Sequence, residues 1–206
     1  MAKAGSFALS VPERERNLPT FGYKQYPWTR QFFETDLRAI PRRKPDVLAV
    51  FESYSGLAGE DLHRAFQSGY TPTVRIVNLP GRLGWTPEEG NEIQLDKTFI
   101  EELETVLPGN KVPRGRVYAP SELETNLLWI LEATVLHELV HFARLKNNEQ
   151  ARLNMKSNKG RAHEEAWADE FEKEAYASRR GMPQSAVLVK WMPKTWMNAH
   201  YLRLTR

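Results

Sequence analysis

The sequence predicts a compact α+β domain in which a small, mostly antiparallel sheet packs on helices and a long buried helix lies at the centre. Three observations lead to this expectation. Residues 120–146 carry apolar side chains on nearly every helical face, which is typical of a central helix. Short segments at 71–81 and 91–96 show the β-branched or alternating patterns of strands. Segments with helical patterning lie on both sides of these strands in the sequence.

The length and the apolar content fit one domain with an extension. The 206 residues are enough for a sizeable core. Proline and aromatic residues crowd the start, so we expect an extended arm over residues 1–30 and the folded domain over 31–206. The chain has no apolar run long enough for a membrane span, and its start lacks the apolar centre of a signal peptide. If the protein is exported, we therefore expect either a route independent of a signal peptide or a sequence that is a fragment of a longer chain.

The charge and cysteine content exclude several classes of site. With 29 basic and 26 acidic residues, the net charge is +3, which indicates a mixed surface and no nucleic-acid partner. The tail over residues 187–206 interleaves basic and aromatic residues, so nucleic-acid binding is an alternative function. This alternative would be excluded if the protein bound DNA only weakly and its affinity did not depend on salt concentration. Without cysteine, a metal would need His, Asp or Glu ligands.

The first half of the chain predicts short elements. We expect helices at 31–39 and 46–54, separated by a loop that contains Pro41 and Pro45. A further helix at 59–70 precedes the strand at 71–81. A loop follows, and then residues 91–96, whose alternation predicts a half-exposed strand at a sheet edge. A short helix ends before Pro108.

The second half predicts two long helices. In the segment 120–146, Ser121 and Glu124 form a capping-box pattern at the start. The polar run 146–160 is expected to be a long loop. Residues 161–181 predict the next helix, with basic residues in its last turn and a terminal glycine.

The motif HELVH within the central helix carries the chemistry. His137 and His141 are four residues apart, so both imidazoles lie on one helical face and can reach one Zn²⁺. Glu138 lies beside them and can act as general base toward a water that the metal activates. Two core histidines with a chance glutamate are the alternative. Because three ionisable groups are costly in a buried helix, we favour the metal.

The third ligand is expected from the helix at 161–181. A catalytic zinc site usually has three protein ligands and one open position. Glu165 and Asp169 are four residues apart, so Glu165 can bind the metal while Asp169 holds a ligating histidine by its other ring nitrogen. Glu164 and His163 are alternatives to Glu165. If His163 were a fourth ligand, the site would be closed, and the zinc would be structural in a binding or toxin module.

HELVH, followed after 23 residues by EAWAD, resembles the zincin metallopeptidases of the gluzincin kind, whose pattern is HExxH and then ExxxD. The resemblance implies that His137, His141 and Glu165 bind Zn²⁺, that Glu138 is the general base and that Asp169 supports a ligand. It implies hydrolysis of peptide bonds in a protein or peptide substrate. It also implies an antiparallel edge strand above the metal, a part that residues 91–96 could play.

The metzincin extension of this motif is absent, because Arg144 and Asn147 stand where its glycine and its third histidine would be. The compact size also resembles zincin toxin domains of bacterial secretion-system effectors, including those of type VI spike proteins. That resemblance implies secretion machinery or an immunity protein as partner, and action inside a target cell. We expect a monomer.

Zincins often place a His, Tyr or Arg across the cleft, where it stabilises the oxyanion. His200 and Tyr201 in the tail are the candidates, with packing of the tail as the alternative role.

Overall fold

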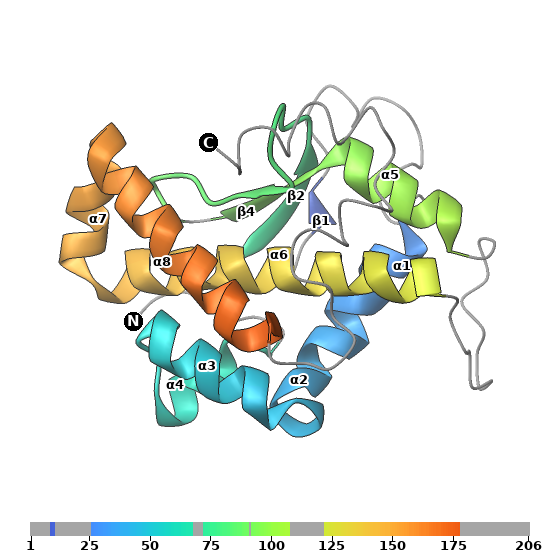
Figure 1. The fold of residues 1–206 in the computed structure, drawn as a ribbon, viewed down its shortest axis with the longest axis horizontal. Coiled ribbons are helices and arrows are strands. Elements are labelled where there is room, and N and C mark those ends of the chain that lie inside the picture. The colour runs from blue at the N-terminus through green and yellow to red at the C-terminus, as the bar shows by residue number, and fades with distance from the viewer. Residues whose placement is uncertain (1–8, 11–25, 68–71, 91, 108–121, 178–206) are drawn as a thin grey trace.

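The computed structural model describes residues 9–10, 26–67, 72–90, 92–107 and 122–177 (Figure 1). The predicted α+β class is confirmed. The helices are α1 (Pro27–Gln31), the π-helical turn η1 (Phe32–Asp36), α2 (Leu37–Arg43), α3 (Pro45–Ser55), α4 (Gly59–Arg64), α5 (Lys97–Val106), α6 (Glu122–Asn147), α7 (Glu149–Met155) and α8 (Asn158–Ala177). The strands are β1 (Leu9–Ser10), β2 (Thr73–Val77), β3 (Gly84–Trp85) and β4 (Glu92–Asp96). The small sheet packs against α5 and α6, and the other helices lie mainly around α6 (Figure 1).

The sheet is mixed, and the expectation of a mostly antiparallel sheet is wrong. Its strand order is β1-β2-β4-β3. β2 pairs in parallel with both β1 and β4, and only the pairing of β3 with β4 is antiparallel. Side chains alternate between the two faces of a sheet in both parallel and antiparallel pairing. The sequence pattern therefore predicts a strand but does not predict the direction in which it pairs.

The strand β4 is internal, although its alternation predicted an edge strand. It lies between β2 and β3, and its apolar residues Ile93 and Leu95 are fully buried. The described strand at this end of the sheet is β3, in a segment expected to be a loop. This two-residue strand lies in contact with α6.

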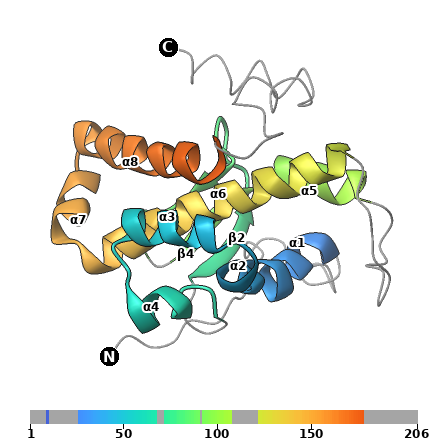
Figure 2. The ribbon, with the colours of Figure 1, turned by 60° about the horizontal axis from the view of Figure 1, so that its bottom comes forward.

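The helix α6 is the central element, as the sequence predicted (Figures 1 and 2). It contacts α3 and α8, and it also contacts β3 and β4 of the sheet. Leu131, Val135, Leu136 and Val140 are fully buried along it. A helix enclosed by other elements buries most of its faces, which explains the nearly continuous apolar sequence.

Several element boundaries differ from the sequence-based expectations. The predicted loop at 146–160 contains α7, where the Asn148 side chain accepts a hydrogen bond from Ala151 N at 3.2 Å and caps the helix. Pro41 lies inside α2, so the break before α3 falls at Lys44 alone. The predicted caps at Ser121 and at 179–181 lie outside the described residues.

The predicted boundary at residue 30 falls within α1. Trp28 of this helix is buried in the core with the residues of α2, α3 and α6. The Glu104 side chain accepts hydrogen bonds from Trp28 N at 3.1 Å and from Thr29 N at 2.7 Å, which anchors the start of α1 on α5. Of the predicted arm, Leu9–Ser10 pairs with β2, and residues 1–8 and 11–25 lie outside the described residues.

A buried polar contact ties α6 to the helices on both sides of it. The two carboxylate oxygens of Glu132 lie 2.7 and 2.5 Å from Lys44 Nζ, at the junction of α2 and α3. The Tyr176 hydroxyl of α8 donates to Glu132 at 3.0 Å. A buried carboxylate needs such partners, because its charge is costly away from water.

Replacing Lys44 by methionine should therefore destabilise the fold, because Glu132 would lose its counter-ion at a buried position. We expect the free energy of unfolding, measured by urea denaturation, to fall by about 3 kcal/mol. Lys173 forms an exposed ion pair with Glu170, so Lys173→Met is the control and should leave stability unchanged. Equal stability of the two variants would contradict a structural role for the Lys44–Glu132 pair.

Candidate metal centre

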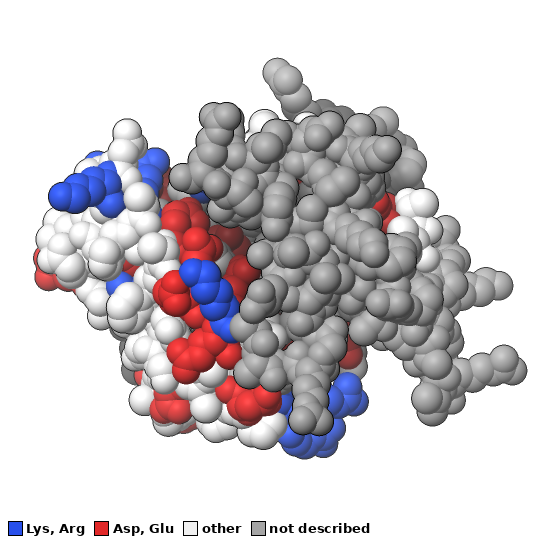
Figure 3. All heavy atoms as spheres, viewed as in Figure 1, with Lys and Arg blue, Asp and Glu red and all other residues white. Residues whose placement is uncertain are grey.

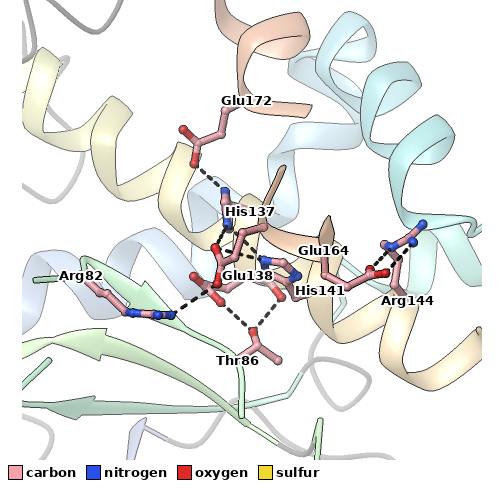
Figure 4. A network of polar contacts seen from close by, with 9 residues as sticks. Arg82, Thr86, His137, Glu138, His141, Arg144, Glu164 and Glu172 are labelled. Carbon is pink, nitrogen blue, oxygen red and sulfur yellow. Dashed lines mark hydrogen bonds and ion pairs between the residues drawn. The ribbon is translucent and has the colours of Figure 1, made fainter. Parts of the chain in front are cut away.

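The two histidines of α6 face each other at the contact between α6 and α8 (Figure 4). Their Nε2 atoms are 3.1 Å apart, and both side chains are buried. This arrangement follows from the helix, since residues four apart lie one above the other on the same face. The two nitrogen lone pairs can therefore be directed at one point.

Glu165 of α8 completes a three-residue cluster with these histidines. Its Oε2 lies 3.6 Å from His137 Nε2 and 3.8 Å from His141 Nε2. Within the described part of the chain, this is the one group of three or more His, Asp or Glu residues whose ligand atoms gather closely enough to hold a metal ion. The structure thus brings together the three residues that the sequence suggested as ligands.

The cluster has dimensions suited to a small divalent cation. Two nitrogen ligands of a tetrahedral zinc ion lie about 3.3 Å apart, because each Zn–N bond is about 2.0–2.1 Å. The observed 3.1 Å between the nitrogens is close to this value, and the nitrogen–oxygen distances exceed it by a few tenths of an ångström. Two imidazoles and one carboxylate are also a common donor set for zinc.

The electrostatics of the cluster favour positive charge at the imidazole of His137. Burial lowers the pKa of His137, but the carboxylates of Glu165 and Glu172 beside its ring outweigh this effect and raise the pKa well above its ordinary value. Burial raises the pKa of Glu165, but the two histidines lower it much more strongly. Acidic side chains also gather on the face that α8 presents in Figure 3. Such a field would stabilise a bound cation.

Glu138 is buried beside the cluster and is held by the segment around β3. The Thr86 hydroxyl lies 2.7 Å from Glu138 Oε2 and 3.1 Å from the Glu138 carbonyl oxygen, and can donate to either. Burial raises the pKa of Glu138, while the neighbouring histidines and Thr86 act in the opposite direction. Gly84 of β3 passes so close that an added Cβ would lie 2.7 Å from Glu138 Oε1. Only glycine fits here without a shift.

Arg82 lies on the other side of the cluster, just before β3. Its guanidinium donates to Glu165 Oε1 at 3.3 Å and stacks on the Trp85 ring at 4.2 Å from the ring centre. Sequence reasoning missed Arg82, Gly84 and Thr86, because they lie in a segment interpreted as a loop. No residue pattern there indicated that the segment contacts α6.

The alternatives for the third ligand have other positions. Glu164 is buried and accepts from Arg144 at 2.8 and 3.3 Å and from Asn154 at 2.8 Å, away from the histidine pair (Figure 4). His163 is exposed, and its nearest acidic partner is Glu164 at 3.6 Å. Neither residue belongs to the cluster.

The remaining candidates are placed as follows. Asp169 is exposed, and no hydrogen bond or ion pair joins it to another described residue. The carboxylate oxygen next to His137 Nδ1 belongs to Glu172, at 2.9 Å. His200 and Tyr201 lie outside the described residues.

A family model described as metallopeptidase toxin 3 matches residues 23–177, which is more than half of the chain. The chain belongs to this family. Its described fold from α1 to α8 and the whole cluster lie within the match, so the cluster is the candidate catalytic centre of a metallopeptidase toxin. No curated protein and no solved structure is significantly similar to the chain.

The contact from Thr86 to Glu138 predicts a matched pair of variants of this metallopeptidase toxin. Thr86→Val removes the hydroxyl that holds the carboxylate, and should lower kcat for a peptide substrate about tenfold. Thr86→Ser keeps a hydroxyl and should stay within about twofold of the parent. A valine variant with full activity, or a serine variant as slow as the valine variant, would contradict this role for the hydroxyl.

Proposed function

We propose that this metallopeptidase toxin is a zinc endopeptidase that hydrolyses peptide bonds of a protein substrate, with Glu138 as general base. The observation that carries the proposal is the convergence of His137, His141 and Glu165 next to the buried carboxylate of Glu138. Two imidazoles and a carboxylate that can bind a metal therefore lie in one small volume with a carboxylate that can act as a base. That arrangement is what hydrolysis by an activated water requires.

Zinc is the proposed metal because of the donor set and its dimensions. His137, His141 and Glu165 would hold the ion, and the chain has no cysteine to offer a competing thiolate site. A zinc ion at this position would polarise the scissile carbonyl and lower the pKa of a water at its open position. His163, the residue considered as a fourth ligand, is exposed and outside the cluster, which favours the catalytic over the structural interpretation.

Glu138 would take a proton from the attacking water and pass it to the leaving amine. For that step its carboxylate must be ionised and fixed in orientation. Donation from Thr86 favours the ionised form, and burial against Gly84 limits the space in which the side chain can move.

Three residues are candidates for stabilising the oxyanion. His200 and Tyr201 remain candidates from the sequence. Arg82 is a further one, because its half-exposed guanidinium lies beside the ligand Glu165 and is oriented by the Trp85 ring. A charged donor fixed at the edge of such a centre is suited to stabilising developing negative charge.

The substrate is expected to be a protein, as for a toxin of the peptidase class. Delivery by secretion machinery, neutralisation by an immunity protein and a monomeric state belong to the proposal. Within the described part of the chain, no helix combines the length and apolar content needed to cross a membrane.

Glu138→Gln tests this function, because glutamine keeps the shape and cannot act as a base. We expect kcat to fall by about a thousandfold, since a general base contributes 10²–10⁴-fold. Zinc content, measured by mass spectrometry of the metal, should remain at one ion per chain. His141→Ala is the control and should lose both zinc and activity.

The central step would be wrong if Glu138→Gln kept its zinc and remained within tenfold of the parent activity. Zinc would be the wrong metal if the purified protein, after dialysis against a chelator, recovered activity with other divalent ions and not with zinc.

A further inference from the structure

The contacts between α6 and α8 follow one antiparallel register. Going toward the N-terminus of α6, Arg144 pairs with Glu164, and His141 then meets Glu165. Next along α6 comes His137, and finally Glu132 with Tyr176, further along α8. Figures 1 and 2 show α8 running back across α6 at an oblique angle, in the opposite direction. The register therefore determines which α8 residue faces each nitrogen of His137.

His137 presents its two ring nitrogens to different residues of α8. Nε2 lies 3.1 Å from His141 Nε2 and 3.6 Å from Glu165. Nδ1 is buried and makes no properly angled hydrogen bond, but it lies 2.9 Å from Glu172 Oε1 (Figure 4). The carboxylate is thus at hydrogen-bonding distance and off the direction of the ring N–H. Glu172 makes no other ion pair with a described residue, and its side chain is partly exposed.

We propose that Glu172 is the positioning residue that orients His137 for metal binding, in place of Asp169. This proposal rests on the proposed function for its metal centre. An imidazole that binds a metal through Nε2 must carry its proton on Nδ1. A carboxylate at Nδ1 selects this tautomer, limits ring rotation and makes Nε2 a stronger donor.

The geometry of α8 explains why the more distant residue takes this position. The residues four and seven positions after Glu165 are Asp169 and Glu172. Both lie near the helical face of Glu165, because they are rotated from it about the helix axis by about 40° and −20°. Asp169 is about 6 Å and Glu172 about 10.5 Å along the axis from Glu165. His137 lies one turn nearer the N-terminus of α6 than His141, and because α8 runs in the opposite direction, the residue that faces His137 lies further toward the C-terminus of α8. Glu172 also has one more methylene group than Asp169 with which to reach the ring, while the Asp169 side chain is exposed.

The test compares zinc affinity of full-length variants at the two positions, measured by competition with a chromogenic chelator. Glu172→Ala should weaken zinc binding by about 10–100-fold, as is typical when a partner of a ligating histidine is lost. Asp169→Ala is the matched control and should stay within about twofold of the parent. Glu172→Gln keeps a neutral acceptor and should give a smaller loss than Glu172→Ala.

Nitrogen NMR of the zinc-loaded protein gives a second readout. His137 should be in the Nδ1–H form in the parent and in Asp169→Ala, and its Nδ1 proton should exchange faster with water in Glu172→Ala. If Glu172→Ala did not fold, Glu172→Gln would decide: a loss of zinc affinity of about fivefold or more supports the proposal.

The proposal is overturned if Glu172→Ala, or Glu172→Gln where the former does not fold, binds zinc within twofold of the parent. It is also overturned if Asp169→Ala weakens zinc binding as much as Glu172→Ala. Failure of the proposed function alone would give a different result. The parent would bind zinc, Glu172→Ala would bind it more weakly, and neither protein would cleave peptides.

Discussion

The site depends on the burial of two histidines and a glutamate in the middle of the apolar helix α6. Ionisable groups at that depth are costly unless each has a partner. His137 and His141 meet Glu165 of α8, and Glu138 accepts from Thr86 beside β3. The apolar residues of α6 hold the helix between α8 and the sheet, and this depth makes the polar contacts necessary. Core packing and candidate chemistry are therefore parts of one arrangement.

The register of α6 against α8 serves stability and the site together. Contacts that hold the helices lie on both sides of the cluster, with Arg144–Glu164 at one end and Glu132–Tyr176 at the other. A shift of one residue in this packing would move Glu165 away from the imidazoles. A centre built on two packed helices is held more rigidly than one built on loops. Such rigidity favours the fixed geometry that a metal site requires.

The sequence predicted the parts of the site that are encoded by helical spacing. His137 and His141 share a face because they are four residues apart, and EAWAD could supply one carboxylate because it lies on the next long helix. It could not predict the roles of Arg82 and Thr86, or the strand directions, because these depend on how distant segments pack. Asn148 is a residue type that favours the start of a helix, and it caps α7 in the structure. The polar composition of the segment nevertheless led to the prediction of a loop.

The most direct test of the account is anomalous diffraction at the zinc absorption edge from crystals of the full chain grown with zinc. We expect one strong peak about 2.0–2.2 Å from His137 Nε2, His141 Nε2 and a Glu165 carboxylate oxygen. A peak bound by other side chains, or no peak at this cluster in a folded protein saturated with zinc, would contradict the account.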